Sequence, residues 1–244
     1  MKKFLIVKSI IRKKESTEIF NHFINVCKHI APRVFKEKKY SNFSDKKLCI
    51  DLIKLKKNNR KALSNIYNTM QISNEILKLG YKKKIQDIAS KYLKIKKENF
   101  ALRNTQFRID LPFDNENTYG WHQDNAYYRY NIKAKNSIVL WIPLINVNKE
   151  NGTLIIMPNS YNCDSSFSSK KIIKKTKFSS EQILVKKQYL KKFGKELSVA
   201  LNKNDALIST AGIFHKSGIN KSNICRFTLI VRFNNIFSDD FIYA

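Results

Sequence analysis

The sequence has few of the residues that break or cross-link a fold. Its 244 residues include 6 glycines, 4 prolines and 4 cysteines. The low glycine and proline content excludes a collagen-like or low-complexity chain. The cysteines lie far apart and form no CxxC pair, which argues against a disulfide framework or a zinc knuckle and favours a reducing compartment.

Long apolar segments are also missing. No run approaches the roughly 18 residues that a membrane-spanning helix needs. The apolar residues 4–7 are followed at once by Lys8, so they are too few for the apolar part of a signal sequence. We therefore expect a soluble, cytoplasmic protein without a transmembrane segment.

Acidic side chains are scarce as well. The chain has 19 Asp and Glu against 47 Lys and Arg, a formal net charge of +28. Such an excess suggests a polyanionic partner, which can be nucleic acid, an anionic membrane surface or an acidic substrate. Residues 1–100 hold 26 basic and 8 acidic residues and residues 170–203 hold 11 and 2, whereas residues 101–169 hold six of each. An AT-rich coding sequence also raises lysine content, so both explanations of the basic surface stay open.

The first hundred residues have the apolar spacing of helices. Residues 16–31 place apolar side chains at helical intervals and end before Pro32. Ser44 is the expected N-cap of a helix over residues 45–57, with lysines opposite an apolar stripe. A further periodic stretch begins at Ser73, and Gly80 divides it into two helices.

From about residue 101 the pattern becomes that of strands. Asn104, Gln106 and Arg108 alternate with apolar side chains, so one face of this strand is polar. Further strands are expected over residues 206–209 and 225–233. Residues 137–145 and 153–158 are expected to form a β-hairpin through the turn NKENG.

These elements predict a single domain over residues 1–244. A helical region, residues 1–100, would pack on a β-rich core, residues 101–244, in an α+β or mainly β fold. Short strands joined by turns favour a sandwich or jelly roll. A lysine-rich insertion at about residues 165–203, helical or irregular, would interrupt the core.

Two histidines and an aspartate form the candidate metal site. The chain has four histidines, and His122 stands two residues before Asp124. In a strand, residues i and i+2 point to the same face, so these two side chains can share a metal, with His215 as third ligand. Two His and one carboxylate are the facial triad of non-haem Fe(II) oxygenases. The alternative is a histidine hydrogen-bonded to a nearby aspartate.

Arg226 follows His215 by eleven residues, on a predicted strand. A guanidinium there can bind the distal carboxylate of a 2-oxo diacid with two hydrogen bonds. Ser217 offers a hydroxyl to the same carboxylate. The alternative for Arg226 is an ordinary arginine on a strand surface.

Four blocks of sequence occur in an order that resembles the phytanoyl-CoA dioxygenase family of Fe(II)/2-oxoglutarate-dependent oxygenases. They are WHQD (121–124), WIPL (141–144), ENGTLIIMPNS (150–160) and NDALISTAGIFHKSGINKSNICR (204–226). The resemblance implies a double-stranded β-helix, a jelly-roll or cupin-like core. It also implies that His122, Asp124 and His215 bind Fe(II), that Arg226 and Ser217 bind 2-oxoglutarate, and that Trp141 packs beside it. A buried core aromatic is the alternative for Trp141.

The family resemblance implies a dioxygenase that uses Fe(II), 2-oxoglutarate and O2. It would hydroxylate an unactivated C–H bond of a small molecule and release succinate and CO2. Because Asp124 is retained, hydroxylation is favoured over halogenation. Asn104, Gln106 and Arg108 are candidate substrate contacts, with solvent exposure as the alternative. The substrate can be anionic or linked to CoA, a sugar or a lipid, and the sequence predicts no oligomeric state.

The sequence leaves two alternative functions open. Arg226 and Arg232 form R-x5-R, a pattern of nucleic-acid dealkylating dioxygenases, and the net charge agrees with it. The neutral composition of residues 101–169 and the spacing from His215 to Arg226 argue against that substrate. A non-catalytic basic β-sandwich that binds an anionic partner is the second alternative.

Overall fold

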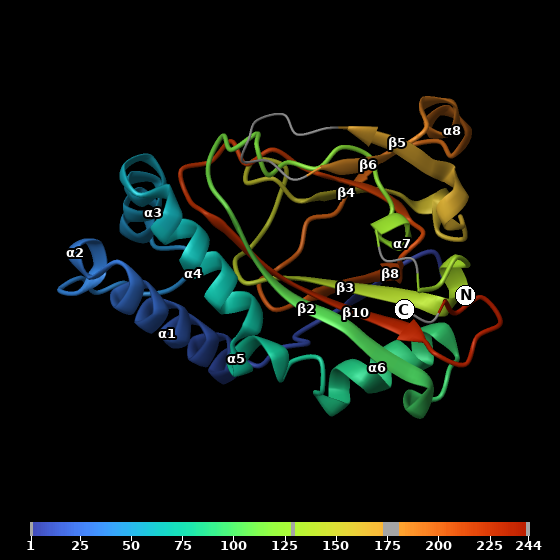
Figure 1. Ribbon diagram of the computed structural model, residues 1–244, viewed down its shortest axis with the longest axis horizontal. Helices are drawn as coiled ribbons and strands as arrows, with labels where there is room; N and C mark the ends of the chain where they lie inside the picture. Colours follow the sequence, from blue (N-terminus) through green and yellow to red (C-terminus); the bar gives the residue numbers. More distant parts are fainter. Residues whose placement is uncertain (1, 128–129, 173–180, 243–244) are drawn as a thin grey trace.

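The computed structural model describes residues 2–127, 130–172 and 181–242. Two antiparallel sheets form its centre (Figure 1). The larger sheet has the order β1 (Leu5–Val7), β8 (Ala206–Thr210), β3 (Ser137–Pro143), β10 (Arg226–Asn235), β2 (Phe100–Asp110). The smaller sheet has the order β7 (Leu197–Ser198), β4 (Leu154–Met157), β9 (Phe214–Ser217).

The larger sheet has two faces of different chemistry. On β2, Phe107 is fully buried, while its neighbour Gln106 is half-buried and lines a cavity. The register aligns Ile230 of β10 with Gln106 on one side and with Trp141 of β3 on the other. These three side chains therefore belong to one row on the cavity face, and the alternation predicted for β2 is confirmed.

Helices of the N-terminal region cover the opposite face of this sheet (Figure 1). The ring of Phe23 lies 5.5 Å from that of Phe107 and 5.4 Å from that of Phe227, so helix and sheet share one apolar core. The helices are α1 (Lys13–Ile30), α2 (Pro32–Phe35), α3 (Lys46–Asn58), α4 (Arg60–Ile72), α5 (Asn74–Leu77) and α6 (Lys83–Leu93).

Helix boundaries differ from the predicted ones in two places. Asp45, not Ser44, caps α3, because its Oδ1 accepts the Lys47 N–H at 2.8 Å. The sequence pattern also gave no boundaries for α4, which Asn59 caps through the Ala62 N–H. Gly80 does separate two helices, α5 and α6, and a Cβ there would lie 2.4 Å from the Leu102 side chain.

The predicted hairpin is wrong. Strand β3 pairs with β8 and β10, and β4 pairs with β7 and β9, so the two lie in different sheets. The turn that contains Gly152 carries the chain from one sheet to the other. A hairpin does not form because β3 is buried along its whole length and takes partners on both edges from elsewhere in the chain.

Two segments contain strands where none was expected. Residues 5–7 form β1 at the edge of the larger sheet, with Leu5 opposite Ile208. The lysine-rich insertion contains the paired strands β5 (Ser168–Ile172) and β6 (Gln182–Val185), followed by α8 (Lys187–Lys192). Residues 173–180 of this insertion lie outside the described part of the chain.

Four short 3-10 helices complete the described elements, at Lys97–Asn99, Ala134–Asn136, Pro158–Ser160 and Ser165–Phe167. In the described ranges, no helix has both the length and the apolar composition to cross a membrane.

Candidate metal centre

The two histidines of the predicted site face each other across a β-bridge. The His122 N–H donates to the His215 carbonyl at 2.9 Å, and the His215 N–H donates to the His122 carbonyl at 3.0 Å. Strand β9 holds His215 against β4 on its other side. The two imidazole centroids lie 4.0 Å apart, so the backbone itself brings together two residues that are 93 positions apart.

Backbone carbonyls fix the tautomer of both imidazoles. Nδ1 of His122 lies 2.8 Å from the Gly120 carbonyl, and Nδ1 of His215 lies 3.0 Å from the Ile213 carbonyl. A carbonyl can only accept a hydrogen bond, so Nδ1 carries the proton in each ring and Nε2 keeps its lone pair. This arrangement is the one that a metal-binding histidine needs.

Asp124 completes the group from the start of a short helix, α7 (Asp124–Tyr127). The expected strand geometry for the H-x-D pair is therefore wrong, although the side chains still converge. Its Oδ1 lies 3.9 Å from Nε2 of His215. One ligand atom from each of His122, Asp124 and His215 lies within 4.8 Å of the other two, and all three residues are buried.

Arg232 of β10 is bound to the same aspartate. Its Nε lies 3.0 Å from Oδ2 of Asp124 and its Nη2 lies 3.3 Å from Oδ1. The remaining Nη1 donates to the side-chain oxygens of Asn104 and Gln106, each at 3.3 Å. These contacts hold the carboxylate of Asp124 in place.

The charges of the group suit a cation. Burial lowers the pKa of His122 to about 3, with a further contribution from the nearby His215 imidazole. Burial alone would raise the pKa of Asp124, but the charge of Arg232 and the hydrogen bonds that it donates outweigh burial and hold the pKa at about 2. At neutral pH the site therefore offers a neutral imidazole at His122 and an ionised carboxylate at Asp124.

Arg226, at the other end of the cavity face of β10, is bound to Asp110. Its Nη2 and Nε lie 3.0 and 3.2 Å from Oδ2 of Asp110. Arg108 lies 2.7 Å from Oδ1 of the same carboxylate. Burial would raise the pKa of Asp110, yet the charges of the two arginines hold it at about 2. Two cations share one anion, which leaves this buried cluster with a net positive charge.

The ENG motif contributes a glycine at this cluster. Gly152 has a φ of +83°, and a Cβ on it would lie 2.8 Å from Nη1 of Arg226 and 2.5 Å from the Gly218 carbonyl. Only glycine therefore leaves room for the guanidinium in its observed position.

One cavity connects these groups. Eight of the nine site residues predicted from the sequence line it: His122, Asp124, His215, Arg226, Ser217, Trp141, Gln106 and Arg108. The ninth, Asn104, is half-buried and bonded to Arg232. The hydroxyl of Ser217 accepts the Tyr119 N–H at 3.3 Å.

Sequence reasoning missed several residues that support the site. Gln182 of β6 accepts the Gly120 N–H at 2.9 Å and donates to the Thr118 carbonyl at 3.0 Å, and the Val185 N–H donates to the Trp121 carbonyl. These hydrogen bonds from the insertion hold the loop that carries His122 in place. Asp110 was also missed, although its position two residues after Arg108 on one strand face was a usable signal.

The chain belongs to the phytanoyl-CoA dioxygenase family, whose model matches residues 50–228. No match is found among curated proteins.

Solved structures share the fold at low sequence identity. AviO1 from Streptomyces viridochromogenes Tue57 has a TM-score of 0.59 and 12% identity, over 99% of this chain and 92% of that one. SnoN, described as a non-heme alpha ketoglutarate dependent epimerase from nogalamycin biosynthesis, has a TM-score of 0.57 and 11% identity, over 96% and 78%. EctD from S. alaskensis, solved with 2-oxoglutarate and 5-hydroxyectoine, has a TM-score of 0.57 and 9% identity, over 96% and 72%. Family and neighbours confirm the predicted double-stranded β-helix with N-terminal helices.

Proposed function

We propose that this protein is an Fe(II)- and 2-oxoglutarate-dependent dioxygenase that hydroxylates an unactivated C–H bond of a small molecule, with release of succinate and CO2. The observation that carries the proposal is the convergence of His122, Asp124 and His215 in one cavity with the cationic cluster at Arg226. Membership of the family supports the same class. A solved SnoN complex contains Fe3+ and alpha ketoglutarate, and the EctD complex contains 2-oxoglutarate, which supports the same class.

The donor set fits Fe(II). Two buried Nε2 atoms and one carboxylate oxygen form the facial triad that leaves open positions for a cosubstrate and O2. When bound, Fe(II) and 2-oxoglutarate supply the oxidising chemistry with O2, and the protein supplies positions and charges. The Nδ1–H bonds to Gly120 and Ile213 keep both rings in the ligating orientation.

In this proposal, Arg226 binds the distal carboxylate of 2-oxoglutarate and Ser217 donates its hydroxyl to the same group. The net positive charge of the Arg108–Asp110–Arg226 cluster matches the single charge of that carboxylate. Trp141, buried on β3 and lining the cavity, would form an apolar wall beside the cosubstrate and exclude water.

A groove beside the cavity could hold a small-molecule substrate, which supports the proposed reaction. This groove runs between α4 and β2 and shares Gln106, Arg108 and Tyr119 with the cavity of the metal centre. A substrate held in this groove would reach the metal centre past these three side chains. Gln106 and Arg108 are therefore the proposed substrate contacts, and Asn104 would act through Arg232.

The nucleic-acid alternative loses its main support. It rested on the R-x5-R pattern together with the net charge of +28, but the guanidinium of Arg232 is bound to Asp124, Asn104 and Gln106. Arg232 is buried and holds the carboxylate of Asp124, so its presence in the motif is explained without a nucleic-acid substrate.

An anaerobic titration tests the proposal. Adding 2-oxoglutarate to the Fe(II)-loaded protein should produce a weak metal-to-ligand charge-transfer band. His215→Ala should abolish the band, while His29→Ala, an exposed histidine on α1, should leave it unchanged. Folded wild-type protein without the band would refute the assignment.

A further inference from the structure

The outer face of α3 combines exposed apolar and basic side chains. Ile50 and Ile53 are 50% and 41% exposed. Exposed lysines flank them on the same face: Lys46, Lys47, Lys54 and Lys57. Within α3, which the structure describes completely, the one acidic residue is Asp51, and it is buried against Lys38 and Tyr40.

Phe113 extends this surface from a loop. It is 65% exposed and has a φ of +56°, which is unusual for a bulky residue. Its N–H donates to the Asn220 carbonyl at 2.8 Å, which fixes the loop. Phe113 and Ile53 line one shallow hollow. The backbone thus holds an aromatic ring in solvent beside the isoleucines of α3, a conformation that carries a cost.

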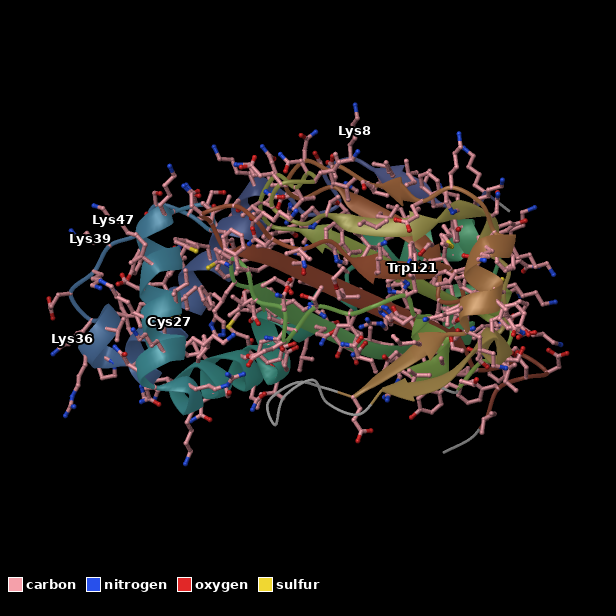
Figure 2. All side chains as sticks on the ribbon, turned by 90° about the horizontal axis from the view of Figure 1, so that it is seen from above. Lys8, Cys27, Lys36, Lys39, Lys47 and Trp121 are labelled. Atoms are coloured by element: carbon pink, nitrogen blue, oxygen red, sulfur yellow. The ribbon has the colours of Figure 1, made fainter. Side chains whose placement is uncertain are left out.

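The lysines of this surface are not neutralised by the nearby acids. Asp114 and Glu116 are bound to Lys56, and Glu116 also to Arg60. In the described part of the chain, Lys47, Lys54 and Lys57 have no carboxylate within ion-pair distance. Lys36 and Lys39 project from the same end of the molecule as Lys47 (Figure 2).

The surface is continuous with the proposed substrate groove. The hollow under Phe113 and the groove between α4 and β2 share Lys56, Leu111 and Asp114. The groove in turn shares Gln106, Arg108 and Tyr119 with the cavity of the metal centre. A molecule bound at the surface would therefore lie at the entrance of the route to His122.

We propose that Ile50, Ile53, Phe113 and the lysines around them dock the protein on an anionic membrane surface. Lysines attract anionic headgroups, and isoleucine and phenylalanine enter the boundary between headgroups and acyl chains. Three apolar side chains among lysines fit this boundary better than a nucleic-acid backbone, which offers them no apolar contact. If the proposed oxygenase activity is correct, the groove then receives an amphiphilic substrate from the membrane.

Vesicle binding tests the docking without any cofactor, so its failure would leave the proposed function untouched. The full chain is mixed with vesicles of phosphatidylcholine alone, or with about 30% phosphatidylserine, at about 0.15 M salt. Sedimentation should show binding to the anionic vesicles only.

Two triple variants with the same net charge locate the surface. Lys47→Gln/Lys54→Gln/Lys57→Gln should weaken the partition coefficient roughly a hundredfold, since each lysine contributes about fivefold. The matched control Lys83→Gln/Lys91→Gln/Lys96→Gln changes exposed lysines on and just after α6, away from α3 (Figure 1), and should change it much less. An equal loss in both variants would show diffuse attraction and overturn the proposal.

The apolar contribution is tested at Phe113. Phe113→Asn, which tolerates a positive φ, should weaken binding about tenfold with an unchanged circular dichroism spectrum. In Phe113→Trp, brominated acyl chains should quench the fluorescence of the introduced tryptophan. Absence of quenching, or binding of duplex RNA or an acidic protein in place of vesicles, would overturn the membrane assignment.

Discussion

The cavity face of β10 has a cluster of arginine and aspartate at each end, and the two clusters differ in the number of arginines for each aspartate. At one end, Arg232 is bound to Asp124 as one cation to one anion. At the other end, Arg108 and Arg226 share Asp110 as two cations to one anion. The first end is therefore neutral before the imidazoles contribute and can accept a metal cation, and the second keeps a positive charge for a carboxylate. The difference teaches that the ratio of arginine to aspartate decides which charge each end of one strand can bind.

The largest effect should come from the metal ligands at the Asp124 end. His122→Ala removes one of three donor groups, so we expect the dissociation constant for Fe(II) to rise by more than the roughly hundredfold seen for residues that only support a ligand. Anaerobic titration calorimetry measures it. Unchanged affinity in His122→Ala, with His29→Ala as control, would place the metal elsewhere.

Arg232→Ala should destabilise the metal-free protein by about 3–5 kcal/mol, because Asp124 would be a buried charge without its counter-ion. Bound metal supplies a new counter-ion, so the loss should be smaller in the Fe(II)-loaded protein. Urea unfolding with and without metal measures both values. Equal losses in the two states would show that Arg232 and the metal do not share Asp124.

Arg226→Ala should raise the dissociation constant of 2-oxoglutarate about a hundredfold, as expected for a charge-assisted pair of about 3 kcal/mol. Fe(II) affinity should stay nearly the same, and Arg226→Lys should recover part of the loss. Calorimetry on the metal-loaded protein separates the two ligands. If cosubstrate affinity is unchanged, the role of Arg226 is wrong.

Acid should act on His122 and on the two aspartates over different pH ranges. The pKa of His122 is lowered to about 3 in the folded protein. Below about pH 6.5 the unfolded chain therefore binds a proton that the folded protein does not bind. The free energy of unfolding then falls by about 1.4 kcal/mol for each unit by which the pH is lowered. The pKa values of Asp110 and Asp124 are lowered to about 2, so their contribution of about 2 kcal/mol each is present above pH 4 and is lost below it. Urea unfolding of metal-free wild type and His122→Gln from pH 7 to 4 should show the first loss in wild type only. The same slope in both proteins would contradict it.

Much of the site was predictable from sequence, because its residues lie within short motifs. The H-x-D pair, His215 and Arg226 could be found from residue type and spacing. Spacing does not give the pairing of Arg226 with Asp110, which depends on the register between β2 and β10. The pairing of Arg232 with Asp124 depends on where α7 lies against β10. The hydrogen bonds of Gln182 depend on the same kind of distant contact.

The fold was predictable in its class but not in its pairings. Apolar spacing indicated helices and strands, yet β3 and β4 were assigned to one hairpin because they are neighbours in the sequence. Strand β1 is three residues long, too short for a pattern. Cys49 and Cys225 are 176 residues apart, yet their sulfur atoms lie 2.9 Å apart where α3 meets the start of β10, which spacing alone could not indicate.

We predict that the metal and the distal carboxylate of 2-oxoglutarate occupy opposite ends of one cavity. An anaerobic crystal structure with Fe(II) and 2-oxoglutarate tests it most directly. We predict metal density between His122, Asp124 and His215, and the distal carboxylate on Arg226 within hydrogen-bond distance of Ser217. Metal at another position, or a distal carboxylate bound away from Arg226, would contradict the account.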